Sequence, residues 1–167
     1  MSGVGEDLAI ADTRELVRTL AEHKATAVAT QVTDAVVVGC DSMFEMDGVV
    51  RGKPVTPDEA LSWAVASRGR SGELHTGHCV IDTATGRAVS DVATTVVRFG
   101  DATDDELAAY VATGEPLAVA GGFTLDGRSA PFVEGVDGDP GNVIGLSLPL
   151  LRDLLARLDL RIIDLWC

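Results

Sequence analysis

The chain has 167 residues, enough to bury a core, and we expect residues 1–167 to form a single domain. Its 26 acidic and 13 basic residues give a net charge of −13, which argues against nucleic acid as a partner. The sequence shows no membrane-spanning run and no signal-peptide pattern, and its cysteines Cys40, Cys79 and Cys167 form no C-x-x-C pair, so we expect a cytoplasmic protein with reduced thiols and no membrane partner.

Lysine is scarce in this chain. Of the 13 basic residues eleven are Arg, and the two lysines are Lys24 and Lys53. A compact ammonium approaches a phosphate oxygen as a point charge, which is one reason to keep Lys where Arg otherwise prevails. With two examples, chance is the competing explanation.

The first expected helix begins with Asp12 or Thr13 as its N-cap and runs to about Ala29. Its apolar stripe consists of Leu16, Val17, Leu20 and Val28, at spacings of three and four. Lys24 falls on this stripe. Either its stem is buried while the ammonium reaches water, or the ammonium has a role in a site.

A buried strand of branched apolar residues starts at Val36 and leads to Asp41. We therefore expect Asp41 at a strand end, where open α/β sheets bind ligands. Asp47-Gly48 predicts a hairpin turn that returns Lys53 towards Asp41. The plainer interpretation is two solvated charges that flank a turn.

A second helix is predicted to begin with Thr56 as N-cap and Pro57 at the first helical position, and to end at Gly69. The Gly-rich loop at its end carries Arg68 and Arg70. Such a pair suits phosphate, but arginine near a helix C-terminus also suits the helix dipole, so both interpretations stay open.

Two strands are expected next, over residues 73–82 and from the turn at 83–86 to Phe99. The first contains H-T-G-H-C. In a strand, His75 and Cys79 face one side and His78 faces the other, so the three side chains are not expected to share one metal ion.

The rest of the chain is expected to be a short helix from Thr103 that Gly114 closes, then Gly-rich loops with short strands, a last helix near Pro149 and a final strand at residues 160–166. This order of helices and hairpins predicts an α/β fold with a mixed sheet.

Several short segments follow one another along the chain. They are Lys24-Ala25, Cys40-Asp41-Ser42, Asp47-Gly48, Gly52-Lys53-Pro54, Arg68-Gly69-Arg70 with Thr76-Gly77, Tyr110 with Gly114-Glu115-Pro116, Ala120-Gly121-Gly122-Phe123, and Gly138-Asp139-Pro140-Gly141-Asn142-Val143-Ile144-Gly145-Leu146. Taken together they resemble, in order and spacing, the motifs of the Maf family of nucleoside triphosphate pyrophosphatases. The resemblance extends from residue 4 to residue 158.

The resemblance implies a mixed twisted sheet in a two-lobed architecture of the Maf and inosine triphosphatase type, with a central cleft for the nucleotide. It implies hydrolysis of a nucleoside triphosphate, of non-standard or pyrimidine type, to the monophosphate and pyrophosphate. It also implies a divalent metal, Mg²⁺ or Mn²⁺, and a homodimer.

The same resemblance implies roles for individual residues. Asp41 is the expected catalytic carboxylate that orients the attacking water, and Lys24 and Lys53 are expected to neutralise the triphosphate. Glu6 and Asp41 are the expected metal ligands. The expected substrate-binding residues are Arg70, Thr76, Glu115, Asp126 and Asn142.

The sequence also departs from the family. The first strand and helix of the family, with the loop S-x-S-P-R-R, have no counterpart in residues 1–167. We therefore expect either a fragment or a mis-started reading frame, or a naturally shortened relative whose grip on phosphate is weakened or lost. Asp126 stands where the family has Gln, so the family's base preference is not carried over. The alternative hypothesis is a catalytically impaired nucleotide-binding or regulatory protein that acts through dimerisation or a partner, without turnover.

Overall fold

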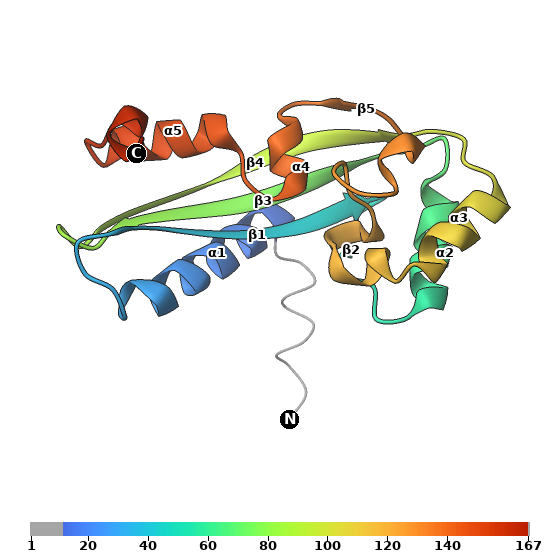
Figure 1. Ribbon diagram of the computed structural model, residues 1–167, viewed down its shortest axis with the longest axis horizontal. Coiled ribbons are helices and arrows are strands. Elements are labelled where there is room, and N and C mark those ends of the chain that lie inside the picture. Colours follow the sequence, from blue (N-terminus) through green and yellow to red (C-terminus); the bar gives the residue numbers. More distant parts are fainter. Residues whose placement is uncertain (1–11, 167) are drawn as a thin grey trace.

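A five-stranded antiparallel sheet runs through the computed structural model, which describes residues 12–166 (Figure 1). The strands lie in the order β2-β1-β3-β4-β5. Their bounds are β1 Val36–Met46, β2 Val49–Arg51, β3 Ser71–Asp82, β4 Arg87–Phe99 and β5 Val133–Asp137. The predicted α/β class is confirmed. Within residues 12–166 every strand pairing is antiparallel, and tight hairpins join β1 to β2 and β3 to β4.

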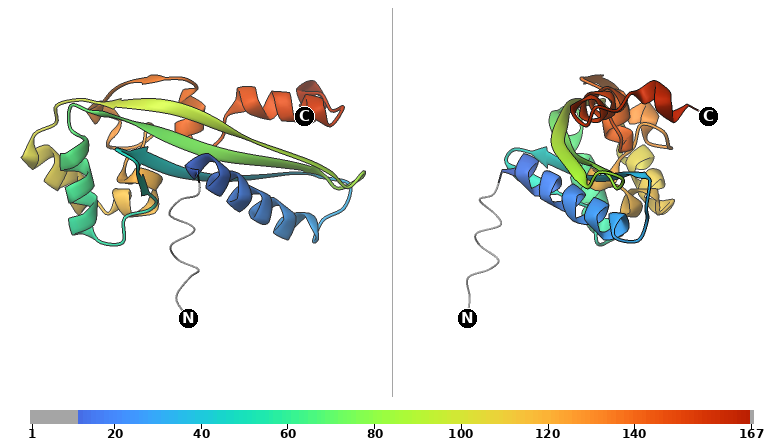
Figure 2. Two further views of the ribbon diagram at one scale, coloured as in Figure 1. Left: turned by 180° about the vertical axis from the view of Figure 1, so that it is seen from behind. Right: turned by 90° about the vertical axis from the view of Figure 1, so that its left-hand side faces the viewer.

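Helices lie on both faces of the sheet. Their bounds are α1 Thr13–Ala29, α2 Pro57–Ser67, α3 Asp104–Ala112, α4 Pro140–Ile144 and α5 Leu148–Arg157. Helix α1 covers one face, α4 and α5 pack on the other, and α2 and α3 gather at one end (Figures 1 and 2). Within the described part of the chain, no helix combines the length and apolar character that crossing a bilayer requires.

Helix α1 begins as predicted, with the Asp12 carboxylate accepting a hydrogen bond from the backbone N–H of Arg14 at 3.1 Å. Its buried residues recur every four positions: Thr13, Val17, Ala21 and Ala25. The predicted stripe was wrong at Val28, which is 49% exposed, and at Lys24, whose side chain is 57% exposed. The small residues of the helix face the sheet instead.

Two glycines let α1 lie close to the sheet. A Cβ atom at Gly39 of β1 would lie 2.5 Å from the carbonyl oxygen of Ala21, and one at Gly77 of β3 would lie 2.1 Å from that of Val17. Real Cβ atoms do not approach other atoms so closely, so side chains at these two positions would lift the helix. The glycines therefore allow α1 to pack closely on both β1 and β3.

Strand β1 is longer than predicted. Asp41 lies in its middle rather than at its end, because the strand continues through polar residues to Met46. The rule about carboxyl ends of parallel strands does not apply to this sheet. Since β2 pairs only with residues 44–46, the edge of β1 before Phe44 is open within the described chain, and Asp41 lies on it.

The predicted hairpin turn is confirmed. Asp47 and Gly48 have φ angles of 54° and 74°, the left-handed values that a two-residue turn with twisted strands requires. The helix starts at Thr56 and Thr103 are confirmed too, since both side chains accept a hydrogen bond from the backbone of the first helical turn.

The C-terminal part differs from the prediction. Residues 160–166 do not form a strand, because Ile162–Leu165 is a turn of 3-10 helix. The Gly-rich segments fold into three more 3-10 turns, strand β5 and helix α4 rather than loops with several strands. Short segments with positive-φ glycines, such as Gly121 and Gly145, bend too sharply for extended pairing.

Candidate active site

A cavity of about 370 Å³ opens beside the middle of β1. Helix α1, the open edge of β1, the segment after β2, residues 118–126 and the end of α4 form its wall. Four of the predicted site residues line it: Lys24, Asp41, Lys53 and Asp126. The structure therefore brings together residues that lie about a hundred positions apart in the sequence.

Lys24 and Asp41 form an ion pair in this cavity. The Lys24 ammonium contacts Asp41 Oδ1 and donates a hydrogen bond to the carbonyl oxygen of Cys40 at 3.3 Å. The pair can form because Gly39 and Gly77 hold α1 against the sheet. An ammonium has three donors, so one remains for a ligand.

Lys53 follows β2 and reaches the same cavity from another element. Its side chain is exposed, and no carboxylate within residues 12–166 forms an ion pair with it. Its charge is therefore available to an anion. Together with Lys24 it brings two ammonium groups to a cavity wall that also carries the carboxylates of Asp41 and Asp126.

The rest of the wall is largely apolar. It includes Leu74, Val119, Phe123, Val143 and Ile144. Polar groups enter this part at Thr124 and Asp126: the Thr124 hydroxyl donates to Asp126 Oδ1, and the Asp126 N–H donates to Thr124 Oγ1 at 3.2 Å. A charged side and an apolar side with few polar groups suit a ligand that combines a polyanion with a flat ring.

Cys40 also lines the cavity, next to Asp41. Burial raises the pKa of its thiol to about 11, and the nearby Lys24 ammonium only partly opposes this. The group is therefore a protonated thiol at neutral pH rather than a thiolate nucleophile.

Two predicted substrate-binding residues have other partners and do not line the cavity. Arg70 forms an ion pair with Asp47 at 2.5 Å and donates to the carbonyl oxygen of Ala66 at 3.3 Å, so it ties the hairpin turn to α2. Glu115 Oε1 accepts a hydrogen bond from the N–H of Arg128 at 2.9 Å and braces the loop that carries Asp126.

Thr76 and Asn142 were also predicted to bind substrate, but both are fully buried. Thr76 lies on the face of β3 that points towards α4, and its hydroxyl donates to the carbonyl oxygen of Asn142 at 3.0 Å. Neither side chain is placed to contact a ligand in the cavity.

The predicted metal ligand Glu6 lies outside the described residues. Within residues 12–166 no group of three or more His, Cys, Asp or Glu side chains is arranged to hold a metal ion. Mg²⁺ is commonly bound by one or two carboxylates together with the phosphates of the ligand. The Asp41 carboxylate, whose side chain is 17% exposed, shares the cavity wall with two ammonium groups, and this arrangement fits that mode.

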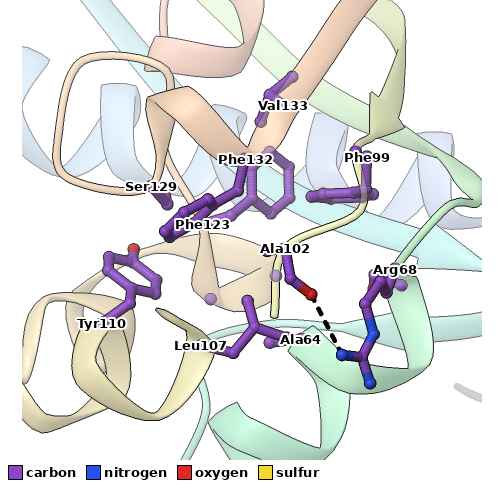
Figure 3. Close-up of a pocket in the computed structure, with 14 residues that line it drawn as sticks. Ala64, Arg68, Phe99, Ala102, Leu107, Tyr110, Phe123, Ser129, Phe132 and Val133 are labelled. Carbon is purple, nitrogen blue, oxygen red and sulfur yellow. Dashed lines mark hydrogen bonds between the residues drawn. The ribbon is translucent and has the colours of Figure 1, made fainter. Parts of the chain in front are cut away.

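A second, smaller cavity shares Phe123 with the first (Figure 3). It holds about 30 Å³ and is lined by Phe99, Phe132 and Tyr110, whose pKa burial raises to about 12. Arg68 at its border donates to the carbonyl oxygen of Ala102 at 3.1 Å. The space suits about one water molecule, so it is not a nucleotide site.

Sequence reasoning missed two groups that line the large cavity: the Ser42 hydroxyl, and the wall formed by residues 143–145. Strand alternation could have indicated Ser42, because it places that side chain opposite Asp41, on the face that α4 covers. Residues 143–145 belong to a motif that the sequence shares with the family, but their contact with the cavity was not predicted, because it depends on tertiary packing.

The sequence matches a protein family and several known proteins. The family model described as Maf-like protein matches residues 2–158. A nucleoside triphosphate pyrophosphatase of Streptomyces coelicolor is 61% identical, over 99% of this chain and 82% of its own length. Proteins of the same name from Salinispora tropica and Gloeothece citriformis are 52% and 46% identical, over 99% and 94% of this chain and 76% and 80% of their own.

Proposed function

The chain belongs to the family of Maf-like proteins, and from this premise we propose that it hydrolyses a nucleoside triphosphate to the monophosphate and pyrophosphate. The observation that carries the proposal is the cavity in which Lys24 and Lys53 accompany Asp41. A chain of net charge −13 can hold a triphosphate only where cations gather locally.

The residues of the cavity support hydrolysis by water. The Asp41 carboxylate orients a water molecule and takes its proton as the oxygen attacks the α-phosphorus. The bond from that phosphorus to the bridging oxygen breaks, and pyrophosphate leaves. Lys24 and Lys53 stabilise the negative charge on the phosphates. Asp41 would hold a divalent ion, Mg²⁺ or Mn²⁺, which supplies further charge neutralisation when bound.

The proposed substrates are non-standard or pyrimidine nucleoside triphosphates. The apolar side of the cavity gives a base a surface to pack on. Asp126 offers a carboxylate, which accepts hydrogen bonds and donates none when ionised. Such a group favours bases with an amino group at the edge, as in cytosine-type pyrimidines. We further propose that the protein acts in the cytoplasm as a homodimer.

The test is pyrophosphate release from a panel of nucleoside triphosphates with Mg²⁺ or Mn²⁺. Asp41→Asn is expected to lower the rate at least about 100-fold, because the base that takes the proton is lost. Asp153→Asn, on α5 and paired with Arg157, is the matched control and should keep the wild-type rate.

Release of pyrophosphate from none of these substrates with either metal would contradict the proposal. Nucleotide binding without turnover in the wild-type protein would instead favour the regulatory alternative.

A further inference from the structure

A line of hydrogen bonds runs from the cavity wall into the interior. Ser42, which lines the cavity, has its hydroxyl oxygen 2.8 Å from Thr76 Oγ1, and the two residues are direct partners across β1 and β3. Thr76 Oγ1 donates to the carbonyl oxygen of Asn142 at 3.0 Å. Thr76 and Asn142 are completely buried.

The direction of donation along this line follows from elementary chemistry. A carbonyl oxygen accepts and cannot donate, so the single hydroxyl proton of Thr76 is committed to Asn142. Thr76 Oγ1 must then accept from Ser42. The Ser42 proton points into the protein, and the lone pairs of its oxygen are left for the cavity.

The side chain of Asn142 holds its own backbone in place, and with it the carbonyl oxygen that accepts from Thr76. Its amide nitrogen lies 3.1 to 3.3 Å from the carbonyl oxygens of Leu74 and Ala93 and from Thr95 Oγ1. Thr95 in turn donates to the carbonyl oxygen of Asp139 at 2.8 Å. These contacts fix α4 on β3 and β4, and with it the acceptor that orients Thr76.

We propose that Thr76 is a positioning residue that makes the Ser42 hydroxyl an acceptor-only group in the cavity, and so favours substrates that bring a hydrogen-bond donor to it. The inference rests on the proposed function. Ser42 lies on the apolar side of the cavity with Leu74 and Val143, while the side chains of Lys24 and Asp41 meet on the α1 side. We take the donor to be an amino group of the base, because the triphosphate is expected beside Lys24 and Asp41.

The test compares pairs of substrates that differ in one base group. CTP has an amino group where UTP has a carbonyl, and GTP has an amino group that ITP lacks. The wild-type protein is expected to show a higher kcat/KM for at least one amino-bearing member. In Thr76→Val the Ser42 proton is released and can turn to the cavity, so this preference should fall by about three- to tenfold. Thr76→Ser keeps the hydroxyl and should keep the preference.

A double-mutant cycle separates positioning from general damage. Ser42→Ala should also lower the preference, and adding Thr76→Val to it should lower the preference no further, because Thr76 acts through Ser42. Ser42→Ala leaves the buried bond between Thr76 and Asn142 intact, so it tests the inference even where Thr76→Val does not fold. Thermal melting of each variant identifies loss of folding.

Binding of non-hydrolysable analogues of CTP and UTP, measured by calorimetry, separates this inference from the proposed function. A preference for the CTP analogue that Ser42→Ala reduces would support the inference, even without turnover. An unchanged preference in folded Thr76→Val and Ser42→Ala, or hydrolysis without any preference for amino-bearing bases, would overturn it while the proposed function stands. Binding of neither analogue, together with no pyrophosphate release from any nucleoside triphosphate of the panel, would overturn both.

Discussion

At the scale of single residues, Lys24 has an arrangement that arginine would not reproduce. Its ammonium meets two oxygens of the same strand, one from the Asp41 carboxylate and one from the Cys40 carbonyl. A compact charge fits between two such acceptors and still offers a donor, whereas a planar guanidinium needs a wider fork of acceptors. This explains a lysine in a chain that otherwise prefers arginine.

Lys24→Gln is expected to raise KM for the nucleotide about tenfold or more, because a charged hydrogen bond to phosphate is lost. Lys24→Arg should recover only part of this effect. Steady-state kinetics on the best substrate measure both. The matched control is Arg152→Gln, which removes one exposed positive charge on α5. A similar rise of KM in the control would show a general effect of net charge instead.

Asp126→Asn is expected to shift preference towards bases with a carbonyl edge, because an amide can donate where a carboxylate only accepts. The ratio of kcat/KM for UTP to that for CTP should rise about threefold to tenfold. Asp105→Asn, an exposed change on α3, should leave the ratio unchanged. If Asp126→Asn also leaves the ratio unchanged, Asp126 does not face the base.

Some predicted site residues line the cavity and others do not. Lys24, Lys53 and Asp41 line it, but charge alone does not distinguish them, because Arg70 and Glu115 are charged too and have partners elsewhere. Thr76 and Asn142 were predicted to bind substrate, but both form hydrogen bonds inside the protein. The Thr76 hydroxyl donates to the backbone carbonyl of Asn142, and the Asn142 amide donates to backbone carbonyls of the strands. Burial of a neutral polar group depends on its tertiary partners, which a local pattern does not contain.

At the scale of elements, β3 packs against α1 on one face and against the start of α5 on the other. Cys79 packs with Ala21 and Ala25 of α1, while His78 faces the opposite side, where its Nε2 accepts a hydrogen bond from the N–H of Ser147 at 2.9 Å. Ser147 is the N-cap of α5. The histidine therefore anchors the start of a helix and must be neutral at Nε2 to do so.

This anchor gives a pH dependence to stability. Burial lowers the pKa of His78 in the folded protein, so the unfolded chain binds more protons once pH falls below about 6.5. The free energy of unfolding is expected to decrease from pH 7 to pH 5, by up to about 1.4 kcal/mol per pH unit for one such group. Burial also lowers the pKa of His75, which contributes in the same direction.

His78→Gln should make this decrease shallower, because glutamine can accept the same hydrogen bond without titrating. Denaturant unfolding at several pH values measures the effect. His23→Gln, an exposed change on α1, should reproduce the wild-type slope. Equal slopes for His78→Gln and the wild type would contradict the role assigned to His78.

The starts of α1, α2 and α3, which have a capping side chain, were predicted correctly. Asp12, Thr56 and Thr103 cap helices as expected, because a cap is a local interaction between neighbouring residues. The end of β1 was misplaced because Asp41 was taken as the edge of a buried run, while its charge is tolerated beside Lys24 from a distant helix. The predicted C-terminal strand failed because residues 160–166 have no strand partner in the described sheet.

At the scale of the whole molecule, separate apolar clusters hold the two ends of the sheet. One cluster comprises Phe44, Met46, Leu74, Val97 and Phe123 and borders the cavity. The other comprises Val80, Leu151, Leu154, Leu155 and Leu158 and fastens α5 to the sheet. Damage to the second cluster should therefore lower stability without altering the choice of substrate.

Leu154→Ala tests this separation. Leu154 is fully buried, so its truncation is expected to cost about 2–5 kcal/mol in the free energy of unfolding. The ratio of kcat/KM between two nucleotides should stay at its wild-type value while the protein is folded. Leu148→Ala, at a residue 62% exposed on the same helix, should change stability by no more than about 0.5 kcal/mol. A changed nucleotide ratio in Leu154→Ala would show that the two ends are coupled.

The long pairing of β3 with β4 makes both ends sensitive to a single misalignment. All 12 residues of β3 pair with β4, from Ser71 opposite Arg98 to Asp82 opposite Arg87. A shift of β3 by one residue relative to β4 would move every side chain of β3 to the opposite face of the sheet. In one direction of the shift Thr76 would take the place of Gly77, and its side chain would clash with α1. Insertions in the turn between β3 and β4 should therefore be tolerated when the extra residues bulge out of the turn. They should disrupt the fold when they shift the pairing of the two strands.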